Sequence, residues 1–181
     1  VRNEMIIDDV ITCVARKQTP VILTRFKEHA KFLHDALKEK ADHVFLLYGD
    51  NSDKENAEIR VKLKQIPENE SLILVATGQK IGEGFDFPRL DVLMLAAPVS
   101  FEGRLEQYVG RLNRDYVGKQ AVYVYDYIDS HVRYFDKMYA KRLRTYRKMG
   151  FSIWTQELQP KQIINAIFDS VNYTEKFEQD I

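Results

Sequence analysis

Two arginines stand close together in the segment QYVGRLNR, which covers residues 107–114. If this segment is helical, Arg111 and Arg114 lie on adjacent turns of one face, because they are three residues apart. Gly110, directly before the first arginine, leaves room for a ligand to approach closely. A planar guanidinium pairs bidentately with phosphate oxygens, so this arrangement predicts contact with a polyanion such as a nucleoside triphosphate.

A second candidate segment, TGQKIGEGFDFP, covers residues 77–88 and contains three glycines. Glycines let backbone amides face a phosphate and permit positive φ angles. Asp86 offers a carboxylate that can accept a hydrogen bond from a ribose hydroxyl, and Pro88 fixes the direction in which the chain leaves the loop. The alternative interpretation is a flexible connection between strands that binds no ligand.

Five short apolar runs are typical of strands: residues 20–26, 43–49, 71–78, 89–98 and 121–129. Their nearly continuous hydrophobicity is typical of a parallel sheet that is buried on both faces. Helical patterns separate the runs, which predicts an open α/β sheet with three layers, α/β/α. Ligands of such sheets bind beyond the carboxyl ends of the strands. We therefore expect the chemistry in the loops that follow Thr24, Tyr48, Ala76, Ala97 and Asp126.

Helical patterns also flank this sheet. Residues 1–18 predict an amphipathic helix leading into the domain, and Ser52 is placed to cap a helix that ends near residue 66. A long helix over residues 131–149 and a short one over 161–171 predict a helical C-terminal extension. The long helix carries a basic stripe, which is either a solvated face or a contact for phosphate or another domain. The stripe consists of Arg133, Lys137, Lys141, Arg144 and Lys148.

The composition excludes several classes of site. The chain of 181 residues has 27 basic and 27 acidic residues, so its bulk charge does not indicate nucleic-acid binding. The single Cys13 excludes a disulfide framework and a multi-cysteine zinc site, and fits a small buried residue. The histidines lack metal-ligand spacing, so we expect no metal site. No apolar run reaches the roughly 18 residues of a membrane span, so we expect no membrane contact. The single thiol and the lack of a signal-like start predict a cytoplasmic location.

The order of these segments resembles the second, C-terminal RecA-like domain of superfamily-2 helicases and translocases. TGQKIGEGFDFP resembles motif V of that family, QYVGRLNR resembles motif VI, and VILTRFKEHAKFLHDAL resembles motif IV. The resemblance covers about residues 20–130, and we assign residues 19–130 to the RecA-like domain. With Gln107 at its start, this segment is similar to motif VI of the DEAH and type III restriction-subunit helicases. Tyr108 stands where many DEAD-box members carry a further arginine.

The resemblance implies a role for each motif. Arg111 and Arg114 would reach across a cleft and act as arginine fingers on the phosphoryl group that is transferred. The nucleotide would also be contacted by four other residues, namely Gly84, Asp86, Gln107 and Gly110. Nucleic-acid phosphate would be contacted by Arg25, Thr77 and Gly78.

The chain lacks the phosphate loop G-x-x-x-x-G-K-[ST] and the acidic D-E-x-H box. The resemblance therefore implies that ATP and Mg²⁺ are held mainly by an N-terminal RecA-like domain of the same polypeptide, with DNA or RNA as the other partner. We expect the chain alone, which begins with valine and which we interpret as a fragment, to be inactive as an ATPase. Two alternatives stay open: a non-catalytic RecA-like docking module, and a free-standing nucleotide-binding α/β enzyme.

Overall fold

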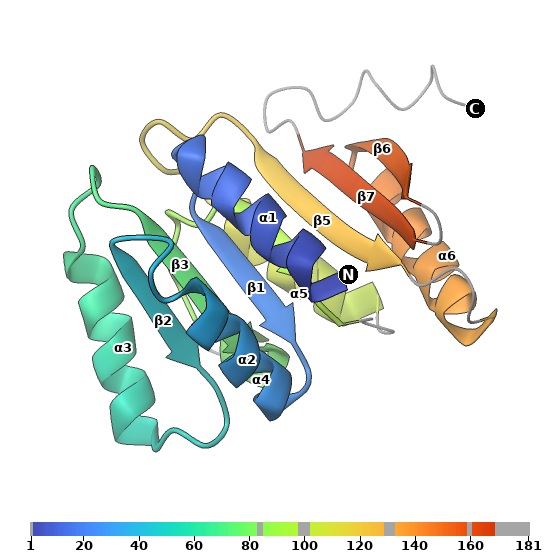
Figure 1. The fold of residues 1–181 in the computed structure, drawn as a ribbon. Coiled ribbons are helices and arrows are strands. Elements are labelled where there is room, and N and C mark those ends of the chain that lie inside the picture. Colours follow the sequence, from blue (N-terminus) through green and yellow to red (C-terminus); the bar gives the residue numbers. More distant parts are fainter. Residues whose placement is uncertain (1, 83–84, 98–101, 129–132, 159–160, 169–181) are drawn as a thin grey trace.

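A central sheet of parallel strands organises the molecule. The computed structural model describes residues 2–82, 85–97, 102–128, 133–158 and 161–168. The five predicted strands are present as β1 (Pro20–Thr24), β2 (His43–Leu47), β3 (Leu72–Thr77), β4 (Val92–Leu95) and β5 (Val122–Ile128). They pair in parallel in the order β2-β3-β1-β4-β5 (Figure 1). The prediction of an open parallel α/β sheet is confirmed.

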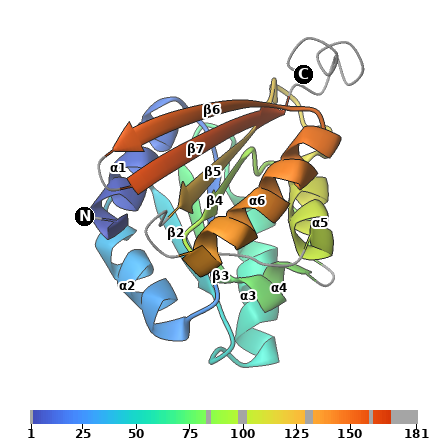
Figure 2. The same cartoon turned by 90° about the vertical axis from the view of Figure 1, so that its right-hand side faces the viewer.

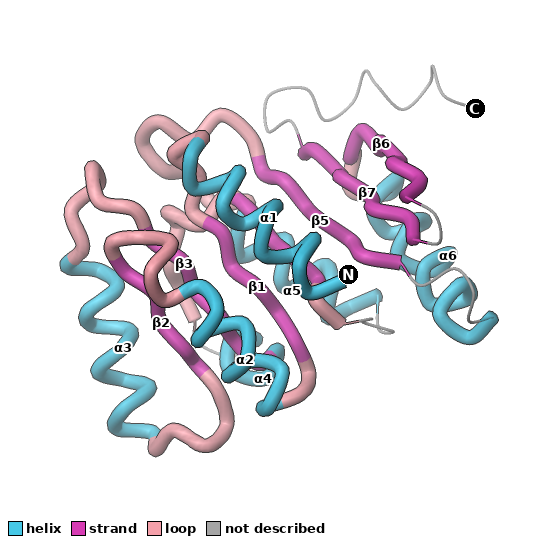
Figure 3. Tube along the Cα trace, viewed as in Figure 1, coloured by secondary structure: helices cyan, strands magenta, loops and turns pink. Residues whose placement is uncertain are grey.

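The C-terminal extension differs from the prediction. The backbone of the region predicted as a short helix at 161–171 forms a strand, β7 (Lys161–Phe168), which pairs antiparallel with β5. A further strand, β6 (Phe151–Leu158), pairs antiparallel with β7 and ends the sheet (Figure 3). The run KQIINAIF fits both a helical and an extended pattern. The unpaired edge of β5 explains the extended form, because it offers backbone partners to an added strand.

Helices cover both faces of the sheet, so the architecture has three layers. On one face lie α1 (Arg2–Ala15) and α2 (Lys27–Leu37). On the other lie four helices (Figure 2). These are α3 (Asp53–Gln65), α4 (Gly78–Gly82), α5 (Glu102–Leu112) and α6 (Arg133–Lys148).

Each face of the sheet carries its own hydrophobic core. One core joins Val21, Leu74 and Leu93 to apolar residues of α3, α4 and α5. The other joins Ile22 and Ile73 to apolar residues of α1 and α2. Alternate residues of each strand thus point to opposite faces, as the pleat of a strand requires. The strands are held rigidly from both sides, which fixes the positions of the loops and helices at their ends.

Local signals in the sequence account for several element boundaries. Ser52 caps α3 with a complete capping box, in which the Ser52 hydroxyl accepts from the Glu55 amide and the Glu55 carboxylate accepts from the Ser52 amide. The predicted cap is confirmed. Cys13 is fully buried against the sheet, and its Sγ donates to the Tyr125 hydroxyl at 3.6 Å. None of the described helices combines the length and the apolar character needed to cross a membrane.

Candidate nucleotide and nucleic-acid site

The helix that carries the first candidate arginine is α5. Its residues Leu105, Tyr108, Val109 and Leu112 follow helical spacing and are all buried against the sheet. This burial fixes the rotation of α5 about its axis. Arg111 is partly buried in the last turn, whereas α5 ends at Leu112 and leaves Arg114 beyond the helix. The prediction that both arginines lie on adjacent turns of one helix is therefore wrong for Arg114.

Arg114 is instead directed to the second candidate segment. Its guanidinium Nη1 lies 3.3 Å from Oδ1 of Asp86, and both side chains are about half exposed, at 47% and 50%. The contact joins the end of the arginine segment to the glycine-rich segment, although 27 residues separate Asp86 from Arg114 in the chain. The structure thus brings two predicted site residues together that only the resemblance had related.

The other residues predicted to contact nucleotide lie on the same layer. Gln107 is exposed on α5 and Arg111 is partly buried one turn later. Gly110 is exposed between them, and a Cβ added there would meet nothing within 4 Å. Open space at Gly110 is what close approach of a ligand from outside requires. Gly84 lies outside the described residues.

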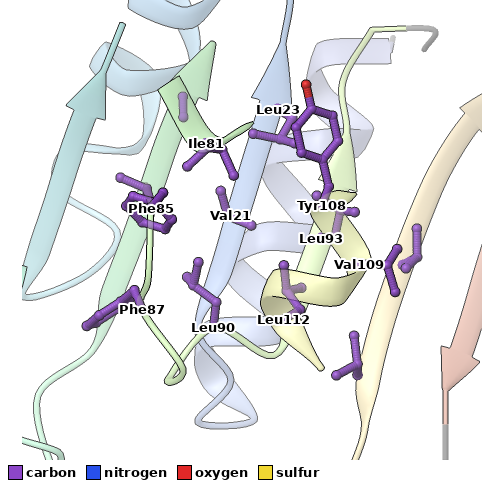
Figure 4. Close-up of a cluster of buried hydrophobic side chains, with 14 of the residues drawn as sticks. Val21, Leu23, Ile81, Phe85, Phe87, Leu90, Leu93, Tyr108, Val109 and Leu112 are labelled. Carbon is purple, nitrogen blue, oxygen red and sulfur yellow. The ribbon is translucent and has the colours of Figure 1, made fainter. Parts of the chain in front are cut away.

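The arginines occupy a different end of the sheet from the one expected. α5 connects the carboxyl end of β4 to the amino end of β5, and these two strands are parallel. The helix therefore runs from the carboxyl ends of the strands towards their amino ends. Figure 4 shows Tyr108 beside Leu23, late in β1, and Leu112 beside Leu90, just before β4. Arg111 and Arg114 thus lie on the helical face towards the amino ends of the strands. The expectation that all chemistry sits beyond the carboxyl ends is wrong for these two residues.

The predicted nucleic-acid residues do lie at the carboxyl ends. Thr77 ends β3 and pairs in register with Thr24 at the end of β1, so Arg25 and Gly78 follow directly after neighbouring strands. Arg25 is exposed, and its guanidinium carbon lies 5.0 Å from the centroid of the Phe26 ring. Thr77 is only 7% exposed. This cluster places the exposed cation of Arg25 and the backbone of Gly78 at the carboxyl ends of two neighbouring strands.

Tyr108 connects the two groups of residues. Its hydroxyl donates to the carbonyl oxygen of Gly78 at 3.0 Å, so α5 is tied to the start of α4, directly after β3. A Cβ added at Gly78 would lie 2.4 Å from the Tyr108 hydroxyl oxygen, which explains why this position has a glycine. Sequence reasoning treated Tyr108 as a departure from a motif and missed this contact. Its only signal was an aromatic residue at a position that many relatives fill with arginine.

The donor set suits a phosphate ligand better than a resident metal. Among the residues that the structure describes, no group of three or more His, Cys, Asp or Glu side chains is placed to hold a metal ion. The half-exposed guanidinium of Arg114 and the open face at Gly110 fit an anionic group presented from outside the domain. Asp86 is the carboxylate that contacts Arg114, and it suits the hydroxyl groups of a sugar rather than a phosphate.

Comparison with known proteins places these residues in a family. The model of the helicase conserved C-terminal domain matches residues 3–115. The transcript termination protein A18 of Yaba-like disease virus is 32% identical over 120 residues, which is 65% of this chain and 24% of that protein. The transcript termination protein OPG145 of Vaccinia virus is 24% identical over 191 residues, 94% of this chain and 38% of that protein.

A solved structure supports the same fold. The crystal structure of UvsW from T4 superposes with a TM-score of 0.60 at 19% identity, covering 81% of this chain and 32% of that one. The chain therefore spans about a quarter to two fifths of the length of these relatives. The chain belongs to the helicase conserved C-terminal domain family, and its fold is RecA-like.

Proposed function

We propose that this chain is the second RecA-like domain of an ATP-driven helicase or translocase and supplies Arg111 and Arg114 as arginine fingers. The observation that carries the proposal is the contact of Arg114 with Asp86 on one exposed face of the domain. A triphosphate and its Mg²⁺ held by an N-terminal RecA-like domain would meet that face. Arg114 would exchange Asp86 for phosphate oxygens, and Asp86 would become free to accept from the ribose.

The carboxyl-end residues form the other half of the proposal. Arg25 is an exposed cation directly after β1, and the Gly78 backbone lies next to it after β3. These groups would contact the phosphates of one DNA or RNA strand. Tyr108 joins this edge to α5, so closure of the nucleotide cleft and movement of the nucleic-acid grip would be coupled through one helix.

The ATPase activity of the full-length protein tests the arginine fingers. Arg111→Ala and Arg114→Ala should each lower turnover by about 10³- to 10⁵-fold while ATP binding persists, because an arginine finger acts on charge that develops during transfer. Arg16→Ala, which removes an exposed arginine at the end of α1 on the opposite layer, is the matched control. Near-normal turnover in both test variants would refute the assignment and favour a non-catalytic docking module.

Nucleic-acid affinity tests the carboxyl-end cluster separately. Arg25→Ala should weaken binding of single-stranded DNA or RNA to the full-length protein and reduce the slope of log affinity against log salt by about 1. Lys38→Ala, an exposed cation at the far end of α2, serves as the control. An unchanged salt slope in Arg25→Ala would remove this residue from the proposed track.

A further inference from the structure

Lys119 binds the backbone at both candidate segments. It lies in the loop between α5 and β5, and its ammonium donates to the carbonyl oxygens of Pro88 at 2.6 Å, Arg114 at 2.9 Å, and Leu112. Pro88 follows Asp86 by two residues, and Leu112 is the last residue of α5. An ammonium has three protons, so these carbonyls use its full donor capacity. One side chain thus joins the glycine-rich segment to the end of the arginine segment.

The backbone of Arg114 needs such a partner. The last hydrogen bond continuing from α5 runs from the Asn113 amide to the Val109 carbonyl at 2.9 Å, and Arg114 lies beyond it. A residue past the helix end does not gain the fixed backbone position that the helical ladder gives. A cation at the C-terminal end of a helix is also favourable, because the free carbonyls there carry partial negative charge. Lys119 supplies that cation and reaches Arg114 as well.

Lys119 is itself held in place. Its amide donates to the Tyr116 carbonyl at 3.0 Å, and Gly118 supplies a positive φ of 83° to the turn between them. The Tyr116 hydroxyl donates to Oε1 of Glu68 at 3.0 Å, which ties the turn to the loop before β3. Burial lowers the pKa of Lys119 to about 8, while the negative charges of Asp91 and Asp115 oppose this shift. The side chain is therefore charged at pH 7.

We propose that Lys119 is a positioning residue for Arg114, which it holds in register with the Asp86 segment for contact with the nucleotide. Lys119 donates all of its protons to backbone carbonyls and touches no phosphate itself. The inference rests on the proposed function of Arg114 as an arginine finger. It adds that the finger is set by a lysine outside both motifs rather than by α5 alone.

Steady-state ATPase measurements on the full-length protein test the inference. Lys119→Met keeps the length of the side chain and removes its donors. The kcat should fall about 10- to 100-fold with the KM for ATP within about threefold, since a misplaced catalytic group loses turnover rather than binding. Lys119→Arg restores a cation with several donors and should recover kcat to within about fivefold of the wild type. A partly unfolded variant would also lower the apparent kcat at unchanged KM, so kcat is expressed per folded protein, with the folded fraction measured by circular dichroism.

The double variant separates positioning of Arg114 from any other effect. Arg114→Ala/Lys119→Met should have the same kcat as Arg114→Ala, because a finger that is absent cannot be misplaced. A further fall of kcat in the double variant would show that Lys119 acts elsewhere and would overturn the inference. Wild-type kcat in Lys119→Met, with Arg114→Ala inactive, would also overturn it and leave the proposed function intact.

Two further outcomes are distinguishable. Near-normal turnover in Arg114→Ala itself would overturn both the proposed function and the inference. If Lys119→Met does not fold, Lys119→Gln takes its place, because its amide still offers two donors. A kcat of Lys119→Gln at or below the wild type, with Arg114→Ala/Lys119→Gln equal to Arg114→Ala, supports positioning, and a double variant with a kcat below that of Arg114→Ala overturns it.

Discussion

Two arginine–carboxylate pairs on the same layer of the molecule differ sharply in burial. Arg142 of α6 donates to Asp126 of β5 through Nε at 2.6 Å and through a terminal nitrogen at 2.9 Å, with side chains 4% and 1% exposed. Arg114 meets Asp86 through one contact of 3.3 Å, with both side chains about half exposed. The same two chemical groups are therefore held much more firmly at one place than at the other.

The difference shows which pair is available for a ligand. Asp126 also accepts a hydrogen bond from the Tyr146 hydroxyl at 2.9 Å, and burial raises the pKa of Tyr146 well above its usual value, so this donor stays protonated. A carboxylate satisfied in this way holds α6 against β5 and cannot release its arginine without leaving a buried charge. An exposed pair gains little from its contact, so Arg114 can exchange Asp86 for phosphate at small cost.

Breaking the buried pair should have the largest effect on stability. Arg142→Met leaves the Asp126 carboxylate buried without its cation and should lower the free energy of unfolding by about 3–5 kcal/mol. Urea denaturation of the purified chain measures this change. Lys141→Met, an exposed neighbour on the same helix, should change the free energy of unfolding by less than about 0.5 kcal/mol.

Removing both charges sharpens this result. Arg142→Met/Asp126→Leu should recover part of the lost stability, because a buried ion pair is often replaced by apolar residues at little cost. The recovery is partial, since the buried Tyr146 hydroxyl then loses its acceptor. A loss below about 1 kcal/mol in Arg142→Met would contradict the contrast between the two pairs. In that case α6 would be held by its apolar contacts, which include fully buried Tyr146, and not by the ion pair.

Disturbing the contact between Gly78 and Tyr108 should change the free energy of unfolding by an amount between the effects for the two arginine–carboxylate pairs. Gly78→Ala places a Cβ about where the Tyr108 hydroxyl lies, at 2.4 Å, and should cost about 1–3 kcal/mol of stability. Tyr108→Phe loses one hydrogen bond and should cost about 1 kcal/mol. Because the phenylalanine also removes the clashing oxygen, the double variant should be more stable than the sum of the single effects predicts. Additive effects in urea denaturation would show that the helix moves away instead.

Asp91 is a partly buried carboxylate near the cations Lys119 and Arg89. Burial raises its pKa to about 6, although the Thr19 amide donates to Oδ1 at 2.6 Å and opposes the shift. A raised pKa in the folded state means that the neutral form stabilises the fold below about pH 4, and that this stabilisation is lost as the pH rises through about 6. Asp91→Asn stays neutral, so its stability relative to the wild type should increase between pH 4 and 6.5.

The expected gain of Asp91→Asn at pH 7 is on the order of 1–2 kcal/mol, measured by urea denaturation across the pH series. Asp53→Asn, which removes an exposed carboxylate from the first turn of α3, should not show this rise over the same interval. A difference between Asp91→Asn and the wild type that stays constant with pH would mean that Lys119 keeps Asp91 ionised throughout.

The parallel part of the fold could be predicted from the sequence because each of its elements is marked by a local sequence pattern. Continuous apolar runs identified β1 to β5, and Ser52 identified the start of α3. The region 161–168 was misjudged as helix because its strand form depends on the distant edge of β5. Local propensity does not report an edge that another part of the chain supplies.

The candidate site could be predicted only in part, because several of its contacts join residues that are distant in the sequence. The residue types and the family resemblance selected Asp86 and Arg114, yet the end of α5 at Leu112 separated Arg114 from the helix. Lys119 was missed because its partners are backbone carbonyls, which every residue has, so no residue type marks them. Asp126 is a charged residue inside the apolar run VYVYDYI, and a buried charge needs a partner. The sequence does not indicate that this partner is Arg142.

Arg114→Ala should have the smallest effect on stability of these substitutions, in contrast to Arg142→Met in the buried pair. Its contact with Asp86 is single, half exposed and screened by salt, so the free energy of unfolding should change by less than about 0.5 kcal/mol. The same substitution should abolish ATP turnover in the full-length protein. Urea denaturation and turnover measured on this variant thus separate a residue kept for a ligand from one kept for the fold. A stability loss above about 2 kcal/mol would place Arg114 with Arg142 as a structural residue, because an exposed pair cannot supply that much.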